Sequence, residues 1–190
     1  MPPTIAPAIA PGTMARLPQP DIDANGPRLR PWRPTDRAAV VAAYADPAIR
    51  HWHCRHMNDD EARDWIDTWP RRWHHETGAG WAIVDTHGVV GQISLRRLAL
   101  DDALAEVSYW VIPAARGHGI APRALTALST WCFTNLGLHR LELAHSTANG
   151  ASCRVAQRAG FTAEGTKRGE GRHADGWHGM HLHARLATDP

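Results

Sequence analysis

The chain has 190 residues, of which 43% are hydrophobic and 21% are charged, and its formal net charge is +2 at pH 7. This length and composition predict one globular domain with a sizeable core, and the near-neutral charge gives no reason to expect a nucleic-acid or membrane partner. The three cysteines have irregular spacing and form neither a disulfide framework nor a CxxC pair, which favours a reducing, cytoplasmic location.

Residues 1–26 are rich in proline and alanine. They lack the basic start and the unbroken apolar run of a signal peptide, and no later segment is apolar for long enough to span a membrane. We therefore expect a disordered leader over residues 1–26 and one folded domain over residues 27–187.

The folded part begins with an expected edge strand at residues 28–33. A helix follows, which Thr35 caps and which Asp46-Pro47 ends. A second helix begins at Asp59 or Asp60, and Pro70 is expected to end or kink it.

The rest of the chain alternates strand patterns with two helices. Strands are expected at residues 81–84, 89–95, 105–111, 141–145, 161–166 and 177–186, and helices at 120–135 and 149–159. This order predicts an α/β fold with a mixed sheet.

The clearest chemical signal lies between the strand at 105–111 and the helix that follows it. The segment reads Arg116-Gly117-His118-Gly119-Ile120-Ala121. Glycines let successive backbone N–H groups turn inward, and such groups at a helix N-terminus bind phosphate with help from the helix dipole. Arg116 can add positive charge.

This segment resembles the pyrophosphate loop of the GNAT superfamily, R/Q-x-x-G-x-G/A, with Arg116, Gly119 and Ala121 at the fixed positions. Residues 149–161 resemble the second family motif, since its Asn, Ser and final Gly-Phe stand where expected. Both motifs occur in order within about residues 28–187, and the branch that they resemble most is that of the ribosomal-protein N-terminal acetyltransferases.

The resemblance implies a central mixed, mostly antiparallel sheet flanked by helices and splayed between its fourth and fifth strands. It also implies acetyl-coenzyme A as donor, with the pantetheine arm in the splayed gap. The implied coenzyme-binding residues are Val111, Ile112, Arg116, Gly117, His118, Gly119, Ile120, Ala121, Asn149, Ser152 and Arg154.

For catalysis, the resemblance implies a general base near Glu106, which alternation places on one strand face with Ser108 and Trp110. The family's usual tyrosine acid has no counterpart in the second motif. Ser152 is the first candidate to replace this acid, and Cys153 and Ser146 are the next candidates.

The implied reaction is transfer of an acetyl group to a primary amine. The nine tryptophans favour a pocket for a small-molecule amine. The alternatives are a protein N-terminus as acceptor, a longer or carrier-bound acyl donor, and a non-catalytic coenzyme A-binding sensor. The glycine segment alone could also be an ordinary turn or a dinucleotide fingerprint, although Pro122 stands where that fingerprint has its last glycine. The family also suggests a homodimer.

Thirteen histidines raise the question of a metal. One group near the first helix matches no regular metal module, and with Trp52 it is expected to line the acceptor pocket; its members are His51, His53, Cys54 and His56. Three histidines of the last strand are expected to be solvated or to form a fortuitous metal-affinity patch; they are His178, His181 and His183. No metal cofactor is therefore expected.

Overall fold

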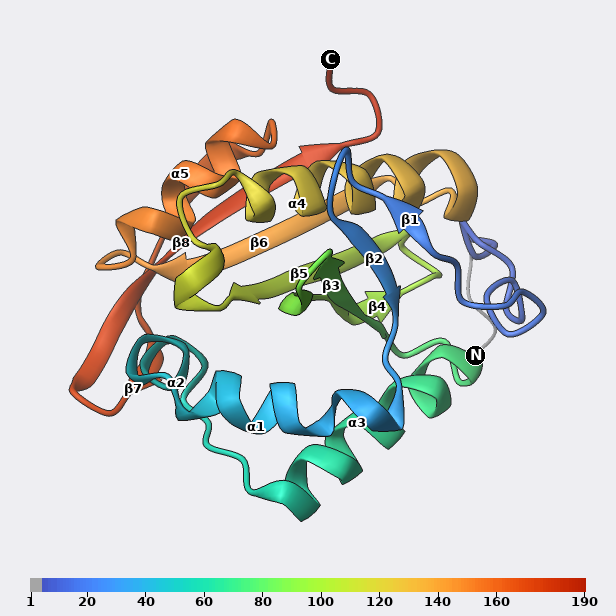
Figure 1. Cartoon of the computed structure of the whole chain (residues 1–190). Coiled ribbons are helices and arrows are strands. Elements are labelled where there is room, and N and C mark those ends of the chain that lie inside the picture. The colour runs from blue at the N-terminus through green and yellow to red at the C-terminus, as the bar shows by residue number, and fades with distance from the viewer. Residues whose placement is uncertain (1–4) are drawn as a thin grey trace.

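The computed structural model describes residues 5–190, and within them one sheet separates two layers of helices (Figure 1). The strands are β1 (Ile22–Asp23), β2 (Arg28–Pro31), β3 (Ala79–Asp85), β4 (Gly88–Ala99), β5 (Leu104–Val111), β6 (Arg140–Ser146), β7 (Thr162–His173) and β8 (Gly176–Leu186). The helices are α1 (Arg37–Ala45), α2 (Pro47–His53), α3 (Asp59–His74), α4 (Ile120–Trp131) and α5 (Gly150–Arg158). The strands lie in the order β1-β2-β3-β4-β5-β6-β8-β7.

The sheet is antiparallel except between β5 and β6. The parallel ladder joins residues 104–106 to residues 140–142, and within the described chain it extends no further, although β5 continues to Val111 and β6 to Ser146. The two strands therefore separate toward their C-terminal ends. This confirms the expected mixed, mostly antiparallel sheet that splays between the fourth and fifth predicted strands, which are β5 and β6.

Each face of the sheet has its own apolar core. The helices α4 and α5 cover one face, and α1 to α3 cover the other (Figure 1). Most of the tryptophans belong to these cores rather than to a pocket; the buried ones are Trp32, Trp69, Trp73, Trp81 and Trp110. Edge-on pairs such as Trp65 with Trp69, whose ring centroids are 5.3 Å apart, each add about 0.5–1.5 kcal/mol to the stability that burial supplies.

Two prolines act differently from the expectation. Asp46-Pro47 ends α1 but also begins α2, because Oδ1 of Asp46 accepts the N–H of Ile49 at 2.9 Å and Pro47 occupies the first helical turn, where its missing N–H costs nothing. The helix α3 passes through Pro70 as far as His74, since its buried face continues to Trp73.

Two element ends also differ. The strand expected at residues 161–166 extends to His173 as β7, because it is defined by pairing with β8 while its own side chains are mostly exposed and polar. The helix expected to reach residue 135 ends at Trp131 and continues as a wider π turn over Cys132–Leu136.

Residues 5–26 pack against the domain, which corrects the expectation of a disordered leader for this stretch; residues 1–4 lie outside the described part. Met14 is fully buried. The carboxylate of Glu76 accepts the backbone N–H groups of Gly12 and Met14, each at 2.6 Å, and that of Ala15 at 3.3 Å. Although burial opposes it, these hydrogen bonds hold the pKa of Glu76 below its usual range.

Indole N–H groups hold the same segment further along. Trp73 donates to the carbonyl of Leu17 at 2.8 Å, and Trp81 donates to the carbonyl of Pro20 at 2.9 Å. The prolines limit regular structure in the leader to the two residues of β1, but backbone carbonyls remain good acceptors. The leader backbone therefore finds partners on α3, β3 and the turn after α3, and also at Leu100 and Asp101. None of the helices found in residues 5–190 has the length and apolarity needed to cross a membrane.

We expect Glu76→Ala to release the leader. Loss of a carboxylate that accepts three backbone N–H groups should lower the free energy of unfolding by about 2–3 kcal/mol and expose residues 5–26 to limited proteolysis. The matched control is Glu170→Ala, which removes an exposed carboxylate on β7. Equal proteolysis of the two variants would contradict the role of Glu76 in holding residues 5–26 on the domain.

Candidate active site

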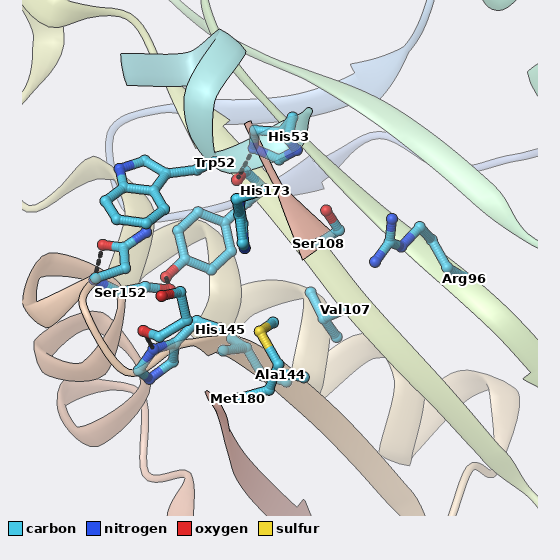
Figure 2. Close-up of a pocket in the computed structure, with 14 residues that line it drawn as sticks. Trp52, His53, Arg96, Val107, Ser108, Ala144, His145, Ser152, His173 and Met180 are labelled. Carbon is cyan, nitrogen blue, oxygen red and sulfur yellow. Dashed lines mark hydrogen bonds between the residues drawn. The ribbon is translucent and has the colours of Figure 1, made fainter. Parts of the chain in front are cut away.

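Two cavities lie where β5 and β6 separate. The inner cavity has a volume of about 160 Å³ and reaches Arg96, His145 and His173 (Figure 2). The loop-side cavity has a volume of about 240 Å³ and reaches Arg116 and Ala121. The side chains that line both cavities are Trp52, His53, Tyr109, Asn149 and Ser152. The two cavities therefore meet between α2, β5 and the start of α5.

The glycine loop, residues 116–121, leads into α4 beside the loop-side cavity. Gly117 and Gly119 have φ values of +83° and +71°, which only glycine adopts without strain. No described atom lies within 4 Å of where a Cβ would stand at either position. Because the first N–H groups of a helix have no partner within it, those of Ile120 and Ala121 are available to an anion.

Arg116 is held in place by two contacts. Its Nε donates to the carbonyl of Val111 at 3.0 Å, and its Nη2 donates to Oδ1 of Asp46 at 2.9 Å. Although burial opposes it, the hydrogen bonds from Ile49 and Arg116 hold the pKa of Asp46 below its usual range. The carboxylate that caps α2 therefore also positions the glycine loop.

The backbone of β5 presents free donors to the gap. The carbonyl of Tyr109 accepts Nε2–H of His53 at 3.1 Å, and that of Val111 accepts Arg116, so both carbonyls point away from β4. Since the N–H and C=O of one residue lie on the same side of a strand, the N–H groups of Tyr109 and Val111 also face the gap. The N–H of Ile112 instead donates to Val90 of β4 at 3.0 Å.

The remaining predicted coenzyme residues are not all together. Asn149 and Ser152 line the loop-side cavity, and Oδ1 of Asn149 caps α5 by accepting the N–H of Ser152 at 3.1 Å. Three others line a separate groove on the far side of the loop; they are Ile112, His118 and Ile120. Arg154 is exposed on α5 and lines neither cavity.

Tyr109 lies at the junction of the two cavities, and sequence reasoning missed it. Its hydroxyl is 2.8 Å from Oγ of Ser152. Burial raises the pKa of Tyr109 to about 12, so the phenol stays protonated at neutral pH and can donate a proton. The signal was present in the strand pattern, because alternation places Tyr109 on the face opposite to Glu106.

Glu106 is buried and ion-paired. Its carboxylate accepts Arg96 at 2.6 Å and lies 3.2 Å from Arg97. It is not among the residues that line either cavity. Glu106 therefore contacts Arg96, which does line the inner cavity.

Arg96 is the one side chain of permanent charge among the described residues that line the inner cavity, and this charge is paired with Glu106. Three histidines also line the cavity, and no carboxylate does. Burial, followed by the charge of Arg96, lowers the pKa of His53 to about 4. As expected for the segment after α1, Trp52 and His53 line the cavity (Figure 2). His51 and Cys54 instead contact His173, and His56 is exposed.

Comparisons with known proteins agree with this architecture. The profile described as an acetyltransferase (GNAT) domain matches residues 28–162. YoaA, an uncharacterised N-acetyltransferase of Bacillus subtilis (strain 168), is 29% identical over 144 residues, which cover 74% of this chain and 81% of YoaA. YdaF, a provisionally named ribosomal N-acetyltransferase of the same strain, is 31% identical over 113 residues, which cover 60% of this chain and 61% of YdaF.

A solved structure gives the same picture of the fold. RimL, the ribosomal L7/L12 alpha-N-protein acetyltransferase, in complex with coenzyme A, superposes with a TM-score of 0.82. The match covers 88% of this chain and 98% of RimL at 20% identity. At this identity the likeness shows the fold.

We expect the ring of His53 to remain neutral until about pH 4. Between about pH 6.5 and 4 the unfolded chain takes up a proton at this position and the folded chain does not. The free energy of unfolding should therefore decrease by at most about 3 kcal/mol as the pH is lowered through this range. NMR titration of the histidine rings measures the pKa of His53.

The matched variant is His53→Gln, which keeps an N–H donor for the Tyr109 carbonyl but has no titrating group. Its stability should change less between pH 6.5 and 4. A measured pKa above 6 for His53 would contradict the burial of its ring and the effect of the Arg96 charge.

Proposed function

The chain belongs to the GNAT family of acetyltransferases, and from this premise we propose that it transfers the acetyl group of acetyl-coenzyme A to the α-amine of a protein N-terminus. The observation that carries the proposal is the meeting of the two cavities at Tyr109 and Ser152. A donor on the glycine-loop side and an acceptor in the inner cavity would react at this junction.

The loop-side cavity suits the donor. The helix N-terminus and the left-handed glycines accommodate a pyrophosphate, and Arg116 adds charge beside them. The unpaired N–H groups of Tyr109 and Val111 can bind the pantetheine as an added strand does, and one of them can stabilise the oxyanion. Asn149 and Ser152 line the path between the loop and the junction.

The inner cavity suits a neutral amine. An amine attacks only when it is unprotonated, and the described residues that line the cavity include no carboxylate to stabilise an ammonium. The amine lone pair forms the new C–N bond at the thioester carbonyl. When the tetrahedral intermediate collapses, the C–S bond breaks and Tyr109 protonates the leaving thiolate, with Ser152 orienting the phenol. The attacking nitrogen then gives up its extra proton, which restores the phenol of Tyr109. We assign Glu106 to positioning Arg96.

The size of the inner cavity favours the end of a longer acceptor. About 160 Å³ is small for a complete drug-sized molecule, but it can hold the terminal residue of a chain whose remainder stays outside. Of the tryptophans that suggested a small-molecule pocket, Trp52 alone lines the inner cavity in the described chain, and Trp110 joins it only in the loop-side cavity. The names of YdaF and RimL, which refer to ribosomal acetylation, support the same acceptor class.

Donor binding can be tested by calorimetry with acetyl-coenzyme A. We expect Gly119→Asp to weaken binding at least about tenfold, because a carboxylate would face the pyrophosphate and the left-handed φ of +71° would be strained. Gly169→Asp is the matched control, since it has a φ of +60° and no atom near its Cβ but lies on β7. An equal loss of acetyl-coenzyme A affinity in both variants would contradict a donor site at the glycine loop.

Transfer itself can be tested by incubating the protein with acetyl-coenzyme A and a panel of acceptors. Peptides with a free N-terminus should gain one acetyl group by intact mass, while the same peptides with a blocked N-terminus should not. We expect kcat/KM for peptides to exceed that for single amino-acid amides by at least about tenfold, through binding outside the cavity. Higher kcat/KM for the small amines would overturn the peptide acceptor.

In the same assay, Tyr109→Phe should lower kcat about a hundredfold with donor affinity retained, because the phenol proton is lost and the ring remains. Ser152→Ala should lower kcat by a smaller factor than Tyr109→Phe, since it removes only the contact that orients the phenol. An unchanged kcat in Tyr109→Phe would show that the thiolate leaves without this acid.

A further inference from the structure

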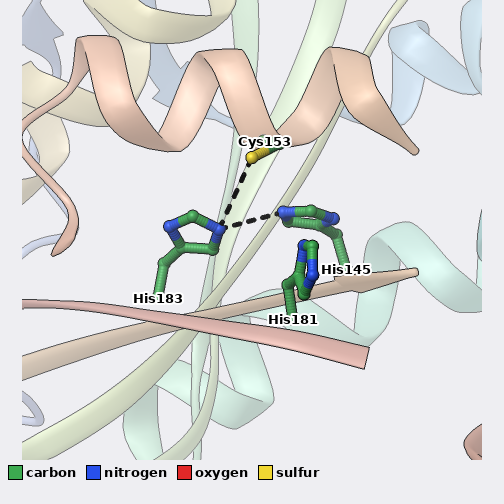
Figure 3. Close-up of side chains that lie close together, drawn as sticks. All are labelled: His145, Cys153, His181 and His183. Carbon is green, nitrogen blue, oxygen red and sulfur yellow. Dashed lines mark hydrogen bonds between the residues drawn. The ribbon is translucent and has the colours of Figure 1, made fainter. Parts of the chain in front are cut away.

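Four metal-ligating side chains meet beside the inner cavity, and the proposed reaction gives none of them a role, although His145 also lines that cavity. They come from β6, α5 and β8, and they are His145, Cys153, His181 and His183 (Figure 3). Their ligand atoms all lie within 4.8 Å of one another. The expectation that His183 is solvated was wrong, because α5 covers this face and leaves that ring 1% exposed.

The fold brings these residues together by register. His145 stands directly opposite His181 in the β6–β8 ladder, and His183 follows two positions later on the same face. The chain then turns from β6 into α5, and the first turn of that helix places Cys153 above the three rings (Figure 3). Both strand pairing and helix packing therefore fix the cluster.

The contacts of His145 aim one ring nitrogen at the ring of His183. Nδ1 of His145 lies 2.8 Å from the carbonyl oxygen of Ser146, and because a carbonyl can only accept, this nitrogen carries a proton. Nε2 of His145 lies 3.1 Å from Nε2 of His183. A shared proton or a bound cation accounts for two ring nitrogens that face each other at this distance.

The geometry points to a zinc ion bound by His145, Cys153, His181 and His183. Tetrahedral zinc with normal bond lengths places nitrogen ligands about 3.3 Å apart and a nitrogen and a sulfur about 3.6 Å apart. The observed separations are 3.1 Å between the two Nε2 atoms and 3.9 Å between Sγ of Cys153 and Nε2 of His183. Imidazole nitrogens and a thiolate are both ligand types that zinc binds, and four of them complete a tetrahedral shell.

Such a site would be structural, because four protein ligands leave no open position for water or substrate. Its effect on the enzyme would be mechanical. Cys153 follows Ser152, whose hydroxyl contacts Tyr109, so a zinc ion would fix the start of α5 against β6 and β8. The inference does not depend on which amine is acetylated.

The test uses untagged protein, since a histidine tag would bind metal itself. After chelation and dialysis, the full chain is titrated with Co²⁺ and followed by absorption. We expect one Co²⁺ per chain, a thiolate-to-cobalt charge-transfer band, the strong visible bands of a tetrahedral centre, and displacement of the signal by Zn²⁺. The melting temperature should rise with Zn²⁺, because the metal binds only the folded state.

The variants identify the ligands. Cys153→Ser should abolish the charge-transfer band, and His183→Gln should weaken Zn²⁺ binding at least about tenfold. The controls are Cys54→Ser and His178→Gln, which alter the separate histidine group around His173. Absence of the band in the wild-type protein, its survival in Cys153→Ser, or its loss in Cys54→Ser would each overturn the assignment.

Discussion

The separation of β5 from β6 is the constraint on which the site depends. Parallel pairing stops after Glu106 and Glu142, and the backbone of β5 then has an open side. Side chains take the place of the missing strand, since His53 of α2 and Arg116 of the loop satisfy the carbonyls of Tyr109 and Val111. An uncovered sheet edge would invite pairing with another chain, and α2 and α5 cover this one. The cavities, the glycine loop and the candidate acid all follow from this single break in the sheet.

Much of the fold could be predicted because its signals are local. The glycine loop and the start of α4 lie within a few residues of one another, and the order of strands and helices follows from periodicity. Where partners are distant in sequence, prediction failed. The leader looked disordered because its partners, Glu76 and the indoles of Trp73 and Trp81, are about sixty residues away. Pro47 was read as a helix end, although the same residue type is equally suited to a first turn.

The site could be predicted only in part, and for the same physical reason. Alternation correctly separates Glu106 from Tyr109 on the strand, but it does not say which helix covers which face. The β4–β5 register sets Arg96 opposite Glu106 and makes an ion pair of the expected base. The packing of α5 brings Ser152 to the phenol on the other face. The tryptophans gave a similar ambiguity, because composition cannot distinguish rings in a core from rings in a pocket.

Asp46 has a consequence beyond holding two elements in place. One carboxylate caps the helix that carries Trp52 and His53 and also binds the arginine of the glycine loop. A phosphate that drew Arg116 toward itself would leave this carboxylate with the helix cap alone. An effect of that change on the inner cavity would be reciprocal by thermodynamic linkage, because each substrate would then alter the affinity for the other by the same factor. The measurable form of such coupling is an acceptor affinity that depends on donor occupancy.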